Sequence, residues 1–255
     1  MADSNFHIPQ PRKRIVPVRH DVARHPRPSG AREQILPMRV MPPAIPADFA
    51  PPRLLYRSLG KRALDICLVL LTAPLALLLI AISALLLWGE GGNPFYHQDR
   101  LGRGGTRFRI YKLRTMVRNA DAELENCLEQ CPDMRAEWET TQKLKKDPRI
   151  TPIGAFLRKT SLDELPQLWN VLNGDMSVVG PRPMMPEQLP LYGSAHHYFA
   201  LRPGITGPWQ VSDRNENLFT MRVDFDAEYN RSLSLKRDVA VLLRTIGVVL
   251  RRTGY

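Results

Sequence analysis

Two adjacent acids, Asp163 and Glu164, lie in the segment RKTSLDELPQ, residues 158–167, which also carries two cations. A carboxylate can attack a phosphorus centre and form a covalent intermediate. Mg²⁺ in phosphate sites takes one or two carboxylates and completes its shell with phosphate oxygens. The pair therefore indicates phosphoryl transfer in which one acid attacks and its neighbour holds a divalent metal.

A structural explanation of the same acids is also open. Ser161-x-x-Glu164 matches a capping box, and Asp163 could itself cap a helix whose first turn contains Pro166. A helix N-terminus favours anions as well. The capping and phosphate-handling interpretations are therefore compatible, and the spacing alone does not choose between them.

Several cations occur in short segments suited to holding phosphate. Lys112 and Arg114 alternate along a predicted strand, so both are expected on the same side, although a solvated edge-strand face gives the same pattern. Arg182 stands between two prolines, whose stiff backbone orients a guanidinium or simply makes a rigid connector. The turn-rich residues 202–207, which begin with Arg202, are a candidate for backbone approach to a ligand.

An apolar run over residues 66–88 contains 23 residues without a charge, enough to cross a bilayer. Pro74 divides it into two pieces that are each too short to cross, and basic residues flank both ends. We interpret residues 53–90 as a membrane-inserted, re-entrant helix broken at Pro74, with a straight, kinked spanning helix as the alternative. The re-entrant form is favoured because everything after residue 88 has the composition of a charged cytosolic domain, with no second span.

The net charge of +11 is concentrated near the N-terminus. Residues 1–62 have a net charge of +8, and residues 1–52 contain 11 of the 23 prolines. We predict that residues 1–52 form a disordered basic arm over anionic lipid. A nucleic-acid binder would carry its basic residues, mixed with aromatics, on a folded face. The charge distribution therefore argues against nucleic acid as a partner.

The remaining residues, 91–255, predict a mainly helical α+β catalytic domain of short helices and loops on the cytosolic side. Alternating apolar residues around the glycines of GRGG, residues 102–105, predict a small β-hairpin over residues 94–116. Helical patterns cover residues 119–130, 133–146, 153–159, 165–172 and 236–252. The last is amphipathic and is expected at the membrane interface, although core packing explains its apolar side equally well. No Walker or Rossmann glycine pattern occurs.

Five motifs occur in an order that is typical of a known family. They are KRALD at residues 61–65, KLRTM at 112–116, RKTSLDELPQ at 158–167, GDMSVVGPRP at 174–183 and RPGITG at 202–207. Together they closely resemble the bacterial sugar transferases, the monotopic phosphoglycosyl transferases. Glu137-Trp138 and Asp147-Pro148-Arg149 add a resemblance to the branch that initiates exopolysaccharide synthesis, typified by undecaprenyl-phosphate galactose phosphotransferases.

The resemblance implies a two-step reaction at the cytoplasmic face of a bacterial inner membrane. Asp163 would attack the sugar-bearing phosphate of a UDP-sugar, with galactose or glucose as the expected sugar, and release UMP. Undecaprenyl phosphate would then take the phosphosugar. Glu164 would be the Mg²⁺ ligand. Phosphate-binding roles would fall to Lys112, Arg114, Arg158, Arg182, Arg202 and Arg214.

The sequence departs from the family pattern at two places. Ala73 precedes the helix-breaking Pro74 where the family often has serine, and Thr72 is a candidate substitute for the serine hydroxyl. Asp213 precedes Arg214 where the family usually has glycine, which leaves the sugar preference open. A different class of function, a non-catalytic membrane scaffold of a polysaccharide export complex, remains the alternative. A homo-oligomer is also compatible with the sequence.

Overall fold

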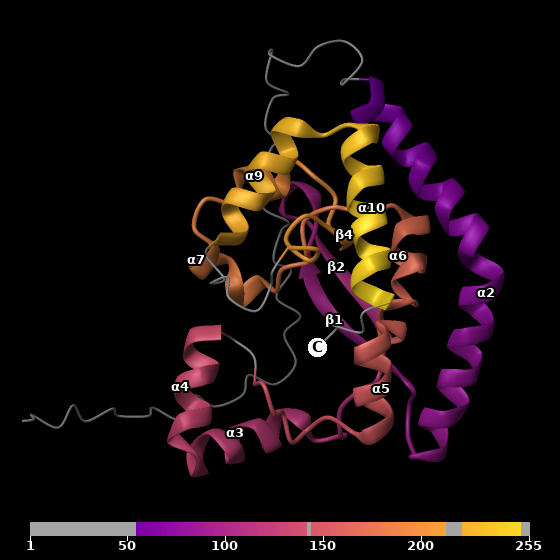
Figure 1. Ribbon diagram of the computed structural model, residues 1–255. Helices are drawn as coiled ribbons and strands as arrows, with labels where there is room; N and C mark the ends of the chain where they lie inside the picture. Colours follow the sequence, from indigo (N-terminus) through magenta and orange to yellow (C-terminus); the bar gives the residue numbers. More distant parts are fainter. Residues whose placement is uncertain (1–54, 142–143, 213–220, 251–255) are drawn as a thin grey trace, which may run out of the picture. The chain divides into compact units, whose positions relative to one another are not determined.

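The computed structural model describes residues 55–141, 144–212 and 221–250 (Figure 1). The arm predicted over residues 1–52 lies outside these ranges, as does Arg214. The longer elements are helices α2 (Lys61–Gly89), α3 (Ala120–Gln130), α4 (Pro132–Thr141), α5 (Pro152–Thr160), α6 (Gln167–Asn173), α9 (Arg222–Ser232) and α10 (Leu235–Leu250), and strands β1 (Phe95–Leu101) and β2 (Arg107–Leu113). The shorter ones are β3 (Ser177–Val179), β4 (Gly204–Thr206), α7 (Leu189–Tyr192), α8 (His196–Phe199), the π-helical turn η1 (Tyr56–Gly60) and the 3₁₀ turns η2 (Arg103–Gly105), η3 (Leu162–Glu164) and η4 (Pro186–Gln188).

Helix α2 is continuous through Pro74 and bends near its middle (Figure 1). Its leucine- and alanine-rich sequence favours helix, whereas Pro74 removes one backbone N–H and clashes with the preceding turn. The Thr72 hydroxyl donates to the carbonyl of Leu68 at 2.8 Å, just before Pro74. The apolar segment that the sequence predicts is therefore a bent helix, and its return to the same membrane face stays a prediction.

One stripe of α2 packs on the rest of the protein. Its buried members include Val69 in the first half and Leu87 in the second. Val69 joins a cluster with Ile110 of β2 and Val171 of α6, and Leu87 joins Leu113 and Leu157 of β2 and α5. The other side exposes many large apolar residues: Leu70, Leu71, Leu75, Leu77, Leu78, Ile82, Leu85, Leu86 and Trp88. The helix spanning residues 56–89 is long and apolar enough to cross a membrane by length and composition.

The predicted hairpin is confirmed. β1 and β2 pair antiparallel, from Phe95 opposite Leu113 to Leu101 opposite Arg107. Gly104 and Gly105 both have positive φ in the connecting turn, a conformation that favours glycine. Lys112, near the end of β2, points its ammonium at the acid pair.

The structure also contains a parallel pair of strands, β3 and β4, that the sequence does not predict. β3 and β4 pair over only three residues each, too few to leave a periodic pattern in the sequence. Their close approach depends on glycine, because a Cβ on Gly204 would lie 2.1 Å from the backbone nitrogen of Gly180. This contact fixes the start of the loop that carries Arg182.

The predicted helices are present with shifted ends. α4 stops at Thr141, before the predicted end at residue 146, and Lys145 and Lys146 lie in a turn before Pro148. α10 buries Asp238 and Val241 and exposes Leu243 and other apolar residues. One side of α10 is therefore core, and the other is an apolar surface.

Candidate active site

Asp163 and Glu164 lie on η3, a single 3₁₀ turn between α5 and α6. Ser161 ends α5 with φ 57°, and it is the only non-glycine residue with positive φ in the part of the chain that the structure describes. Such strain in a non-glycine residue is typical of functional sites. The left-handed turn ends α5, and the acids of η3 lie next to β2.

The capping explanation of the acid pair is wrong. Ser161 is the C-cap of α5, and its side chain makes no capping hydrogen bond to η3. The N-cap position of α6 is Pro166, again without a side-chain cap. Asp163 is therefore not the N-cap of the following helix, and Ser161 does not cap η3 through its side chain.

Cations from three separate elements surround the pair. The ammonium of Lys112 lies 2.7 Å from Oε1 of Glu164 and 4.0 Å from Oδ2 of Asp163. A guanidinium nitrogen of Arg182 lies 3.8 Å from the same Glu164 oxygen. Arg158 donates from Nε to Oγ1 of Thr115 at 2.8 Å, and its charge acts on Asp163. Five residues expected from the sequence are thus brought together.

Burial dominates the electrostatics of Asp163, whose side chain is 9% exposed. Burial raises the pKa of the Asp163 carboxyl to about 6, and the charge of Glu164 acts in the same direction. The positive charge of Lys112 is the largest opposing effect, followed by Arg158 and Arg182. At neutral pH Asp163 is therefore mostly ionised, and its carboxylate is buried among cations that offset only part of the cost of burial. A nucleophile is expected to have such a perturbed environment.

Two arginines that the sequence did not predict support the Arg182 loop: Arg222, which is buried, and Arg100, which is partly buried. Arg222 of α9 donates to the carbonyl of Arg182 at 3.0 Å, and Arg100 of β1 donates to the carbonyl of Pro183 at 3.3 Å. Burial, followed by the nearby charge of Arg182, lowers the pKa of each to about 10. Neither lies in one of the five motifs, so the sequence did not single them out.

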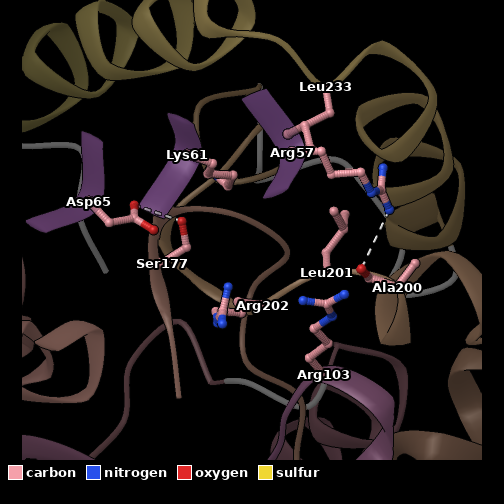
Figure 2. Close-up of a pocket in the computed structure, with 9 residues that line it drawn as sticks. All are labelled: Arg57, Lys61, Asp65, Arg103, Ser177, Ala200, Leu201, Arg202 and Leu233. Atoms are coloured by element: carbon pink, nitrogen blue, oxygen red, sulfur yellow. Dashed lines mark hydrogen bonds between the residues drawn. The ribbon is translucent and has the colours of Figure 1, made fainter. Parts of the chain in front are cut away.

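Three predicted site residues are not part of this group. β2 ends at Leu113, so the strand alternation does not reach Arg114, which donates to the carbonyls of Asn93 and Leu87 at the end of α2. Arg202 lines a different pocket, with Arg57, Lys61 and Arg103 (Figure 2). Arg214 lies outside the described residues.

The acid pair has the right donors for Mg²⁺ bound together with a phosphate. Among the described residues, no group of three or more His, Cys, Asp or Glu could hold a metal ion by itself. Mg²⁺ in phosphate sites commonly needs only one or two carboxylates. Glu164, beside Asp163, therefore fits a metal that arrives with a substrate phosphate.

The domain thus combines a bent helix that is apolar enough to cross a membrane, a hairpin, and a carboxylate pair among cations. The family model described as Bacterial sugar transferase matches residues 56–252, and the chain belongs to this family. The match covers every structured element of the described chain.

Curated relatives support the family assignment. The UDP-galactose-lipid carrier transferase of Erwinia amylovora is 49% identical over 195 residues, which cover 76% of this chain and 41% of that protein. The exopolysaccharide production protein ExoY of Rhizobium meliloti is 44% identical over 205 residues, or 78% of this chain and 89% of ExoY. The UDP-glucose:undecaprenyl-phosphate glucose-1-phosphate transferase of Caulobacter vibrioides is 37% identical over 203 residues, with 76% and 70% covered. This chain therefore spans less than half of the first relative and most of the other two.

Proposed function

We propose that this protein transfers a sugar-1-phosphate from a UDP-sugar to undecaprenyl phosphate and releases UMP. The observation that carries the proposal is the buried carboxylate of Asp163 among Lys112, Arg158 and Arg182. These three cations suit a diphosphate, and Asp163 supplies a nucleophile in their midst. The names of the relatives from Erwinia amylovora and Caulobacter vibrioides support the donor, and the latter name supports the acceptor.

We propose that the reaction proceeds in two displacements at this site. An Asp163 oxygen attacks the sugar-bearing phosphorus, and the bond from this phosphorus to the bridging oxygen breaks, so that UMP leaves with the electron pair. A phosphate oxygen of the lipid then attacks the same phosphorus, and Asp163 leaves as a carboxylate. Lys112, Arg158 and Arg182 stabilise the negative charge on the phosphate oxygens in both steps. Mg²⁺ held by Glu164 would supply further charge neutralisation when bound.

The membrane setting of the proposed reaction rests on α2. Both halves of this helix pack on the same catalytic body, through Val69 and through Leu87. A folded polar body does not cross a bilayer, so this packing supports a re-entrant helix with both ends on one face. We place that face on the cytoplasmic side of the inner membrane, where UDP-sugars are made, and infer a role in the first step of exopolysaccharide assembly.

The test is to give detergent-solubilised full-length protein Mg²⁺, undecaprenyl phosphate and a panel of UDP-sugars, with galactose and glucose first. We expect UMP and a lipid-linked phosphosugar from the wild type, and loss of both for Asp163→Asn. Asp99→Asn is the matched control, because Asp99 is an exposed acid on β1. Release of UDP, or full activity of Asp163→Asn, would contradict the proposal.

The covalent intermediate has its own readout. Without undecaprenyl phosphate, the first displacement should leave one phosphosugar on each protein molecule, and the intact mass should rise accordingly. Addition of undecaprenyl phosphate should remove it. A protein that acts only as a scaffold would show neither the mass change nor UMP.

A further inference from the structure

A second cationic pocket lies away from the acid pair. Its cations come from three places in the chain: Arg57 of η1 and Lys61 of α2, Arg103 of the hairpin turn, and Arg202 after α8 (Figure 2). Its lining has no residue in common with the group around Asp163. The pocket is therefore a separate cationic site, which does not contain Asp163 or Glu164.

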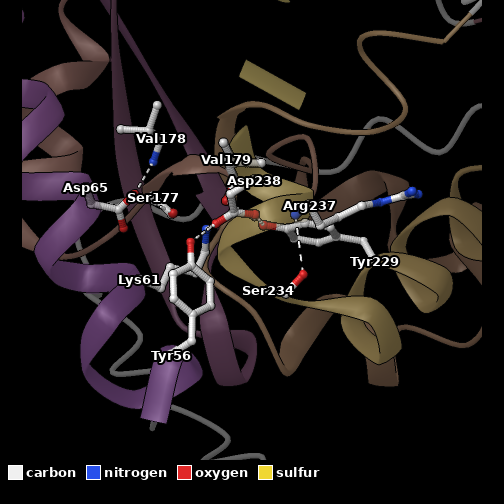
Figure 3. A network of polar contacts seen from close by, with 10 residues as sticks. All are labelled: Tyr56, Lys61, Asp65, Ser177, Val178, Val179, Tyr229, Ser234, Arg237 and Asp238. Atoms are coloured by element: carbon white, nitrogen blue, oxygen red, sulfur yellow. Dashed lines mark hydrogen bonds and ion pairs between the residues drawn. The ribbon is translucent and has the colours of Figure 1, made fainter. Parts of the chain in front are cut away.

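The acid and the lysine of this pocket are already used by the fold. Asp65 accepts from the hydroxyl of Ser177 at 2.8 Å and from the backbone nitrogen of Val178 at 2.9 Å. The ammonium of Lys61 lies 2.7 Å from Oδ2 of Asp238, a fully buried acid (Figure 3). Lys61 is thus neutralised, and it contributes little net charge to a ligand.

The arginines contribute the charge that remains. Arg202 donates from Nε to the carbonyl of Gly174 at 2.8 Å, which is a neutral partner. In the described part of the chain, neither Arg103 nor Arg202 has a carboxylate within ion-pair distance. Burial lowers the pKa of Arg202, and the charges of Arg103 and then Arg62 lower it further, whereas the charge of Asp65 raises it. Arg103 and Arg202 therefore repel each other across the pocket, and an anion between them would relieve that repulsion.

The position of Arg57 places the pocket at the start of the apolar helix. Leu55 and Leu59 flank Arg57, and they are 63% and 68% exposed. Exposed leucines next to arginine are typical of a segment at the membrane interface, where apolar side chains enter the lipid and cations meet head groups. The guanidinium of Arg57 donates to Oδ1 of Asn230 at 2.6 Å and to the carbonyl of Asn230 at 3.2 Å, and it reaches the carbonyl of Ala200 at the pocket at 3.5 Å (Figure 2).

We propose that Arg57, Arg103 and Arg202 form a phosphate-binding site, and that its ligand is the head group of an anionic phospholipid. Three guanidiniums match the planar, multidentate recognition of phosphate oxygens better than ammonium groups do. The bound lipid would join the start of α2, the hairpin turn and the segment after α8 at the membrane surface. This inference does not depend on the chemistry proposed for Asp163.

The test uses full-length protein in a neutral detergent and follows its thermal unfolding midpoint as short-chain phosphatidylglycerol is added. The variant is Arg103→Gln, since Arg103 is exposed and its removal leaves the core intact. The matched control is Arg107→Gln, which removes the same charge from an exposed position of the same hairpin outside the pocket. Phosphatidylcholine of the same chain length and inorganic phosphate are titrated in parallel.

We expect phosphatidylglycerol to stabilise the wild type, and Arg103→Gln to weaken its apparent affinity by about tenfold, the loss of one charge-assisted contact. Arg107→Gln should stay within about twofold of the wild type, as for an exposed charge. If inorganic phosphate competes with the lipid and shows the same dependence on Arg103, the phosphate site stands and its ligand is a soluble phosphate. Equal affinities for the two variants, or no response of the wild type, would overturn the proposal.

Discussion

At Asp163, burial and charge act in opposite directions on one carboxyl group. Burial raises its pKa to about 6, and the positive charge of Lys112 opposes this most strongly. An ordinary surface aspartate is easier to ionise and a poorer nucleophile, because water stabilises its charge. The site therefore holds a carboxylate that is ionised at neutral pH but poorly stabilised, and whose charge is a cost to the fold.

That cost predicts that Asp163→Asn is inactive but more stable. The folded pKa lies above the unfolded value of 3.8, so the stability is highest when Asp163 is protonated and falls as pH rises from about 4 to about 6. At pH 7, Asn should raise the free energy of unfolding by about 1–3 kcal/mol. Denaturant unfolding in detergent measures this difference, which should disappear near pH 4. A variant that is less stable at pH 7 would show that Asp163 is well stabilised as an anion.

The same electrostatics predict a shift in the acid limb of the activity profile. Because an attacking carboxylate must be ionised, the rate should fall below about pH 6, by about tenfold per pH unit. Lys112→Met removes the largest attractive charge, so the pKa of Asp163 rises and the limb moves to higher pH. UMP release measured from pH 5 to pH 9 tests this. Arg109→Met, at an exposed position of the same strand, should leave the acid limb of the pH profile in place. A lower rate with no shift would mean that Lys112 acts only on substrate.

At the scale of elements, the site depends on how closely α5 approaches the end of β2. Gly154 of α5 lies against Thr115, and a Cβ at this position would be 2.0 Å from the Thr115 carbonyl oxygen. The hydroxyl of Thr115 in turn accepts from Arg158. The absence of one side chain therefore sets the position of the cation that faces Asp163.

Gly154→Ala should therefore damage both stability and activity. Overpacking against backbone atoms costs about 1–3 kcal/mol, and the displaced α5 moves Arg158 away from Asp163. Gly247→Ala is the control, because nothing lies within 4 Å of a Cβ at that position in α10. The control should stabilise its helix by about 0.5–1 kcal/mol. Thermal unfolding and UMP release distinguish the two variants, and normal activity in Gly154→Ala would show that α5 can shift without loss.

The elements that sequence predicts well are those with a long pattern. The apolar run predicts α2, and the alternation around the glycines of the turn predicts β1 and β2. In both cases a pattern of apolar residues extends over many positions. The three-residue strands β3 and β4 and the left-handed Ser161 have no such pattern. Short motifs predict Lys112, Arg158 and Arg182 as site residues. Arg100 and Arg222 support the site only through contacts between segments that are distant in the sequence, which no local pattern predicts.

At the scale of the whole molecule, one buried acid joins the start of the apolar helix to the C-terminal helix. Asp238 of α10 accepts from Tyr56 at 2.6 Å, from Lys61 at 2.7 Å and from Tyr229 (Figure 3). At the other end of α2, Arg114 donates to the carbonyl of Leu87 at 3.1 Å. Both ends of the helix are thus fastened to the same body, with an apolar face left exposed along its length.

These contacts predict that both ends of α2 lie on one side of the membrane. A helix that crossed the bilayer would have to release either the Lys61–Asp238 pair or the contact at Leu87, and breaking a buried pair costs about 3–5 kcal/mol. Single cysteines at Ser58 and at Glu90, in a variant without Cys67, Cys127 and Cys131, report the two ends. In intact spheroplasts, an impermeant maleimide should label neither position, and it should label both after lysis. Labelling of one position from outside would establish a spanning helix, and would then require that the catalytic body bind only one half of α2.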